Sequence, residues 1–145
     1  MHWMAWPQTL PRLAAAMTGN AVLAILDRTY EEPPWWADLT EVITRHSRNP
    51  HYVPGFNVPD ELAAQGLWHI TGRATTSYSS FRQPVAAFIE QFHSTSSLAR
   101  KWMSDEESAE FDAATERIVR PHADADGTVQ VSVAAEMVWG RPTAD

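Results

Sequence analysis

The sequence lacks cysteine, long apolar runs and a signal peptide, and each absence limits the possible functions. None of the 145 residues is cysteine, which excludes disulfides, thiolate zinc sites and a cysteine nucleophile, and fits a reducing compartment. The longest apolar run, residues 21–26, is far shorter than a membrane span. The first residues lack the cationic region and apolar stretch of a signal peptide. We therefore expect a soluble, cytoplasmic protein with no membrane partner.

Basic charge is also scarce. Eighteen acidic and 11 basic side chains give a formal net charge of −7, and no run of lysine or arginine interrupts the chain. Nucleic-acid binders carry clustered positive charge, so this class of partner is not expected. A small molecule or another protein is favoured instead. The length suits one domain, since domains take about 100–200 residues.

Familiar catalytic and metal motifs are missing. Six histidines are present, but none stands in HExxH, and His46 and His51 are separated by a helix end and a proline. The GxSxG elbow of serine hydrolases is absent, and so is a glycine-rich phosphate loop. The sequence therefore predicts no metal site, and no catalytic constellation is visible in it.

Apolar residues at spacings of three and four predict amphipathic helices. The helix that follows Ser104 begins with a capping box, in which Ser104 and Glu107 bond the amides of the first turn. The predicted helices cover residues 6–17, 36–47, 59–66, 81–93 and 105–120.

Three segments predict strands. Residues 21–27 form a continuous apolar run, which suits a parallel strand buried on both faces. Residues 67–74 are a second strand. Residues 128–139 alternate as a half-exposed antiparallel strand, with one apolar side made of Val129, Val131, Val133, Met137 and Trp139. A helix leading into a buried parallel strand is half of a βαβ unit, so we expect the partner strand to lie upstream of Met1.

Several short local sequences point to a family. They are His2-Trp3-Met4, Pro34-Trp35-Trp36, His46-Ser47-Arg48-Asn49, Phe81-Arg82-Gln83-Pro84, Phe92-His93-Ser94 and Val138-Trp139-Gly140-Arg141-Pro142. With the order of helices and strands, they make the whole chain resemble the C-terminal half of a class I S-adenosylmethionine-dependent methyltransferase. The resemblance is to the small-molecule, methyltransferase type 11-like group, which includes trans-aconitate and ubiquinone/menaquinone-biosynthesis enzymes.

The resemblance implies an α/β fold with a partial Rossmann-like sheet and four to five helices. The helix from Trp6 would be the family's fourth helix, and residues 21–27 its fifth, parallel strand. Residues 67–74 and 128–139 would be its last two strands, which pair antiparallel. The helices between these two strands resemble the family's variable insertion over the substrate mouth.

The resemblance also implies methyl transfer from S-adenosylmethionine to a small-molecule acceptor. It suggests His2 or His93 as the catalytic base and His2 with Trp3 as cofactor contacts. The implied acceptor-binding residues are Trp3, Arg28, Gln83 and His93. Asp27 would lie beside Arg28, at the edge where loops converge on ligands in open α/β sheets.

The chain departs from the family in one respect. It contains no counterpart of the glycine-rich loop after the first strand, nor of the acid that ends the second strand. We therefore expect one of three cases: a truncated chain, a start set too late, or half of a split enzyme that a second chain completes. In each case we expect the chain to be inactive alone and to expose the apolar surface of residues 21–26. The alternative is a non-catalytic α+β module that binds a ligand or a protein.

Overall fold

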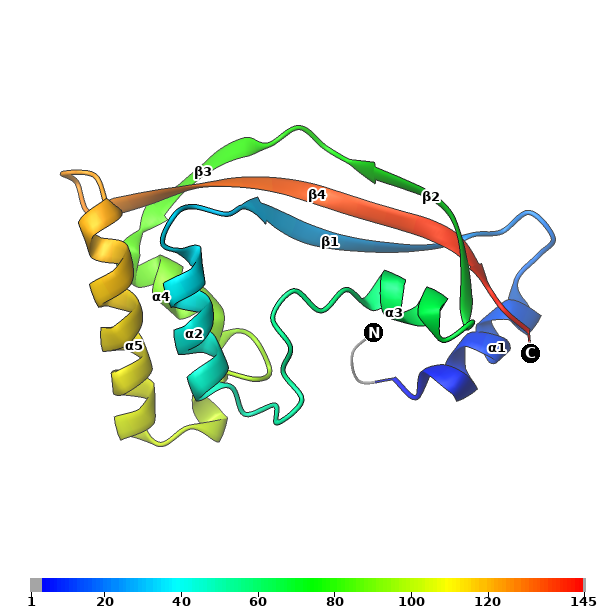
Figure 1. The fold of residues 1–145 in the computed structure, drawn as a ribbon, viewed down its shortest axis with the longest axis horizontal. Coiled ribbons are helices and arrows are strands. Elements are labelled where there is room, and N and C mark those ends of the chain that lie inside the picture. Colours follow the sequence, from blue (N-terminus) through cyan, green and yellow to red (C-terminus); the bar gives the residue numbers. More distant parts are fainter. Residues whose placement is uncertain (1–3, 145) are drawn as a thin grey trace. The chain divides into compact units, whose positions relative to one another are not determined.

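The computed structural model describes residues 4–144, which fold as two compact units (Figure 1). Among these residues, unit 1 contains residues 4–29, 56–77 and 134–144. Unit 2 contains Tyr30–Gly55 and Tyr78–Val133. The single domain suggested by chain length stays a prediction.

One antiparallel sheet contains all four strands of the described residues (Figure 1). Strand β4 (Thr128–Pro142) is central, with β1 (Leu23–Glu31) along one edge. Along the other edge lie β2 (Trp68–Thr75) and then β3 (Ser79–Pro84). The predicted antiparallel pairing of residues 67–74 with 128–139 is confirmed. Together with five α-helices among residues 4–144, the sheet makes the protein an α/β fold.

The strand predicted at residues 21–27 is present as β1, but the prediction that both of its faces are buried is wrong. Strand β1 is antiparallel to its neighbour and occupies the end of the strand order, and none of its residues is buried. A continuous apolar run indicates an extended segment, but it does not reveal which faces of that segment the chain itself covers. No strand among residues 4–144 is a parallel neighbour of β1, and the parallel partner that the resemblance implies stays a prediction.

In unit 1, helices α1 (Trp6–Ala16) and α3 (Val58–Ala64) cover one face of the strands (Figure 1). The first helix was predicted from its apolar spacing, and the second from the proline and acids at its start and the glycine at its end. The buried core between helices and strands consists of Leu10, Val58, Leu62, Trp68 and Val138. Partly buried Leu23 and Ile25 pack against this core, so the alternate residues of β1 point to the opposite face.

That opposite face of unit 1, called the outer face below, carries apolar side chains. Leu26 is 69% exposed and Val22, just before β1, is 55% exposed, which confirms the expected exposure of residues 21–26. On β4, Met137 is 37% exposed, and the Trp139 indole lies over Gly72, where a Cβ would collide with it. The strands of unit 1 are thus apolar on both faces.

Met137 and Trp139 were predicted on the apolar side of β4, and the structure corrects this. Val129 and Val131 are buried in the first half of the strand, but Ala134 and Val138 are buried in the second half. The alternation changes phase near Ala135, whose amide donates to the Thr76 hydroxyl instead of continuing a regular ladder. Irregular pairing of this kind shifts the phase of a strand, and two-residue alternation in a sequence cannot reveal it.

Unit 2 packs three helices on β3 and the first half of β4. These are α2 (Trp36–His46), α4 (Val85–His93) and α5 (Asp105–Val119), with short 3₁₀ turns η1 (Arg100–Trp102) and η2 (Arg120–His122). The capping box of α5 is confirmed: Glu107 N–H donates to Ser104 Oγ at 3.1 Å, and Ser104 N–H donates to Glu107 Oε2 at 2.8 Å. The buried core consists of Trp35, Leu39, Val42, Val85, Phe88, Ile89, Leu98, Phe111, Ala114, Val119, Val129 and Val131.

The helix predicted over residues 81–93 is shorter than expected. Residues 81–84 belong to β3, where Phe81 pairs with Val131, and α4 begins at Val85. The residue before a proline avoids helical backbone angles, so Pro84 keeps Gln83 extended. Phe81 lies four residues before Val85, which is a helical spacing, so the predicted helix included residues that belong to the strand.

Candidate functional site

The residues implied by the family resemblance are not gathered in one unit. His2 and Trp3 lie outside the described residues. Arg28 is an exposed residue of β1 in unit 1, whereas Gln83 in β3 and His93 in α4 belong to unit 2. The structure therefore offers separate environments to examine.

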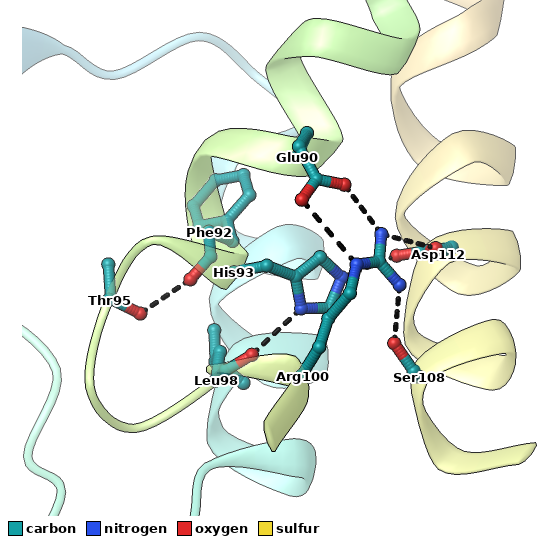
Figure 2. Close-up of polar contacts among 8 residues, drawn as sticks. All are labelled: Glu90, Phe92, His93, Thr95, Leu98, Arg100, Ser108 and Asp112. Carbon is teal, nitrogen blue, oxygen red and sulfur yellow. Dashed lines mark hydrogen bonds and ion pairs between the residues drawn. The ribbon is translucent and has the colours of Figure 1, made fainter. Parts of the chain in front are cut away.

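His93 is buried, and the protein engages both of its ring nitrogens (Figure 2). Nδ1 lies 2.8 Å from the Leu98 carbonyl oxygen, and Nε2 lies 2.7 Å from Asp112 Oδ1. A carbonyl oxygen only accepts, so Nδ1 carries a proton and donates it to Leu98. His93 thereby fastens the segment after α4 to α5. In this structure it has no ring nitrogen left to act as a base or to bind an acceptor.

Arg100 extends this network (Figure 2). Its guanidinium donates to Glu90 Oε2 at 2.6 Å, to Asp112 Oδ2 at 3.1 Å and to Ser108 Oγ at 2.5 Å. The hydrogen bond from Arg100 lowers the pKa of Glu90, and the same bond raises the pKa of Arg100. The charges of this network are paired with one another, so it ties η1 to α4 and α5 rather than presenting a reactive group.

Gln83 is the second predicted residue in unit 2. Its side-chain nitrogen is buried and has no hydrogen-bond partner within residues 4–144. An unpaired buried donor costs about 1–3 kcal/mol. Gln83 does not line the cavity of unit 1 described below.

Unit 1 contains a cavity of about 360 Å³ between β1, β4 and the beginning of α3. This volume lies within the usual range of small-molecule sites, about 300–1,000 Å³. The residues that line it are Ala24, Ile25, Leu26, Asp27, Phe56, Asn57, Val58, Pro59, Glu136 and Val138. We call it the unit 1 cavity.

Two carboxylates share the unit 1 cavity with apolar walls. On alternating strands, Asp27 lies on the same face as Ile25, and Glu136 on the same face as Val138. Glu136 is half-buried and forms no hydrogen bond or ion pair within the described part of the chain, and Asp27 accepts only from the Arg28 amide, at 2.8 Å. None of the described residues that line the cavity is lysine or arginine. These residues therefore give the cavity a net negative charge.

The lining of the unit 1 cavity includes one aromatic residue, Phe56. Phe56 is 46% exposed and stacks on Trp6, with ring centroids 6.4 Å apart and planes 12° apart. Asn57 is occupied with α3, because its Oδ1 accepts from the Asp60 amide at 3.0 Å. The groups available to a ligand are thus two carboxylates, an aromatic ring and aliphatic side chains.

Sequence reasoning placed Asp27 near a ligand edge but missed Phe56 and Glu136. Phe56 stands in a loop with proline and glycine and gives no periodic signal. Glu136 was assigned to the polar side of its strand, yet it shares a face with the buried Val138. Once the change of alternation near Ala135 is known, Glu136 can be recognised as a candidate, because an acid two residues from a buried residue lies on the buried face of the strand.

The described residues hold no group of three or more histidine, cysteine or acidic side chains that could bind a metal ion. Among the helices of residues 4–144, none is long and apolar enough to span a membrane. No protein-family model matches the chain, and no curated protein matches it.

Proposed function

We propose that the chain is the C-terminal part of a class I S-adenosylmethionine-dependent methyltransferase that acts on a small-molecule acceptor, and that elements outside it bind the cofactor. The observation that carries the proposal is the strand order β1-β4-β2. The resemblance assigns β2 and β4 to the last two strands, which pair antiparallel, as observed from Trp68–Pro142 to Thr75–Glu136. In this scheme β1 is the fifth strand of the family, and the α/β fold of the chain is part of a Rossmann-like sheet.

The exposed edge of β1 also supports the proposal. β4 occupies one edge of β1, and no strand of the described residues pairs with the other. Next to this edge the outer face exposes Val22 and Leu26. An unpaired strand edge beside an apolar, uncovered face favours pairing with another segment. A neighbouring strand and covering helices, from a longer polypeptide or from a second chain, would bury both.

The cofactor itself does not fit the described residues. S-adenosylmethionine would supply the methyl group, and the family holds it against a glycine-rich turn that leads from a strand into a helix. Two such connections exist here, from β1 to α2 and from β3 to α4, and neither contains glycine. We therefore derive no catalytic step for this chain and expect it to be inactive alone.

The part that this chain would play is to hold the acceptor. In methyl transfer most of the rate comes from keeping acceptor and methyl group in line, which binding residues achieve. His2 and Trp3 remain proposed contacts of the cofactor or acceptor, and Arg28 and Gln83 of the acceptor. His93 would support the segment around it rather than remove a proton.

The test begins with the tagged chain, purified from its native cells and analysed by mass spectrometry and calorimetry. We expect it alone not to bind S-adenosylmethionine. We also expect a stoichiometric associated segment with a glycine-rich strand-to-helix turn, and cofactor binding by that assembly. Leu26→Lys should weaken the assembly at least tenfold, because it places a charge on the apolar outer face. Val53→Lys is the matched control, since Val53 is 56% exposed in unit 2.

Two results would overturn the proposal. One is a chain that remains a monomer in those cells with no such segment. The other is an assembly that forms but does not bind the cofactor.

The second candidate is a non-catalytic α+β binding module, which the unit 1 cavity favours because the cavity is formed by the chain alone. Such a module would unfold cooperatively as a monomer without partner or cofactor. Soluble aggregates, or a requirement for another segment, would argue against it.

A further inference from the structure

The unit 1 cavity has a definite chemical character. Its lining combines the carboxylates of Asp27 and Glu136 with aliphatic and aromatic side chains, and no lysine or arginine stands among the lining residues of the described structure. The Glu136 carboxylate is half-buried without an internal partner among residues 4–144. Charges that are partly desolvated attract an opposite charge more strongly than charges in bulk water do.

The walls determine which kind of cation fits. Ile25, Val58 and Val138 contribute apolar side chains, and the exposed residue Phe56 also lines the cavity. Aromatic faces attract organic cations, and apolar walls bury the hydrocarbon part of a ligand. A metal ion gains nothing from such walls. It also requires more oxygen ligands than two carboxylates supply, since Asn57 Oδ1 is already used as the cap of α3.

We propose that the unit 1 cavity binds a small organic ammonium ion with an aromatic or aliphatic body. The ammonium group lies between Asp27 and Glu136, and the body lies against Val58, Val138 and Phe56. The proposal concerns binding by this chain alone and does not require methyl transfer.

The experiment is a titration of the full chain with phenethylammonium chloride, followed by amide chemical shifts and calorimetry at low salt. Saturable shifts are expected at residues 24–27, 56–58 and 136–138. The uncharged analogue 2-phenylethanol should bind at least tenfold more weakly, because it lacks the charge. Raising the salt concentration should weaken ammonium binding and leave the analogue unaffected.

Variants locate the site. Glu136→Gln and Asp27→Asn keep the size of each side chain and remove its charge, so each should weaken ammonium binding about tenfold. The control is Glu110→Gln, an exposed acid of α5 in unit 2, which should bind as the unmodified chain does. Unchanged amide shifts away from the substituted residue would show that each variant is folded.

Four outcomes would overturn the proposal. They are the absence of saturable shifts at millimolar phenethylammonium, equal affinity for 2-phenylethanol, equal weakening by Glu110→Gln, and tighter saturation of the same amides by calcium chloride. None of these depends on S-adenosylmethionine. The ammonium site and the proposed function can therefore fail separately.

Discussion

The two units differ in how completely they bury their own apolar surface. Among the described residues, the core of unit 2 contains twelve buried side chains, drawn from three helices and the strands beneath them. The core of unit 1 contains five, all on one face of its strands, while Val22, Leu26 and Met137 stand exposed. Unit 2 also exposes apolar side chains, among them Val53 and Trp102, but it has the larger buried core, whereas unit 1 has a smaller core and an apolar face that nothing in the described residues covers.

The two units therefore differ in role: unit 2 contains most of the buried core, and unit 1 contains the surfaces that could bind a ligand or another segment. Helices α2, α4 and α5 bury apolar side chains in the core of unit 2, and ion pairs such as Arg100–Glu90 connect its segments. The strands of unit 1 retain a free edge, an uncovered face and a negative cavity. The free strand edge that supports the proposed function and the cavity of the ammonium proposal both lie in unit 1.

The largest expected effect is in the core of unit 2. Phe111 is fully buried and its ring meets those of His46, Phe92 and His93. Phe111→Ala should lower the free energy of unfolding by about 3–5 kcal/mol, through lost burial and the cavity that remains. Urea titration followed by circular dichroism measures this. Glu110→Ala, at an exposed neighbouring position, should change the value by less than about 0.5 kcal/mol, and equal losses would refute the assigned core.

Leu62→Ala tests the smaller core of unit 1. Leu62 is fully buried in α3 against the strands, so its truncation should cost about 2–5 kcal/mol. Hydrogen exchange can locate the loss, because β2 amides should lose more protection than α5 amides. If the amides of α5 exchanged faster to the same extent as those of β2, Leu62 would not belong to a core that is confined to unit 1.

The cap of α5 comes next in size. Ser104→Ala removes the side chain that accepts from the Glu107 amide, and such losses cost about 1 kcal/mol. Ser104→Asp should retain most of the stability, since aspartate caps equally well. Thermal unfolding of the three proteins gives the comparison, and an Asp variant as unstable as the Ala variant would rule out capping as the cause.

Acid should destabilise unit 2 through Glu107. Hydrogen bonds from the Ser104 backbone and Arg48 hold the Glu107 pKa below its ordinary 4.5 in the folded protein. A pKa lowered by folding adds stability that is fully present above the unfolded value and is lost as pH falls through the folded value. Stability should therefore decline below about pH 4.5, and less steeply in Glu107→Gln. Parallel pH profiles of the two proteins in urea would contradict this.

Local signals predicted local structure well. Ser104 and Glu107 are three residues apart, and their exchange of hydrogen bonds follows from that spacing alone. The helices of unit 2 followed from their apolar stripes. Phe81 misled because its spacing from Val85 is helical, although Pro84 and the pairing with β4 make it part of a strand.

What the sequence could not reveal depends on distant residues. The apolar run at 21–27 predicted a strand, but its place at the sheet edge depends on which other strands are present. His93 was favoured for its residue type, and its partners Leu98 and Asp112 lie 5 and 19 residues away. The unit 1 cavity likewise joins Asp27, Phe56 and Glu136 from three segments.

The smallest expected effect tests the uncovered face directly. Leu26 and Ile25 are neighbours on β1 and point to opposite faces, with Leu26 69% exposed and Ile25 packed against the core of unit 1. Leu26→Thr should change the free energy of unfolding by less than about 0.5 kcal/mol. Ile25→Thr should cost at least about 1 kcal/mol, because it places a hydroxyl against apolar side chains. Both are measured by urea titration of the chain alone. Should Leu26→Thr cost as much as Ile25→Thr, the outer face would be covered by the chain itself, and unit 1 would be as complete as unit 2.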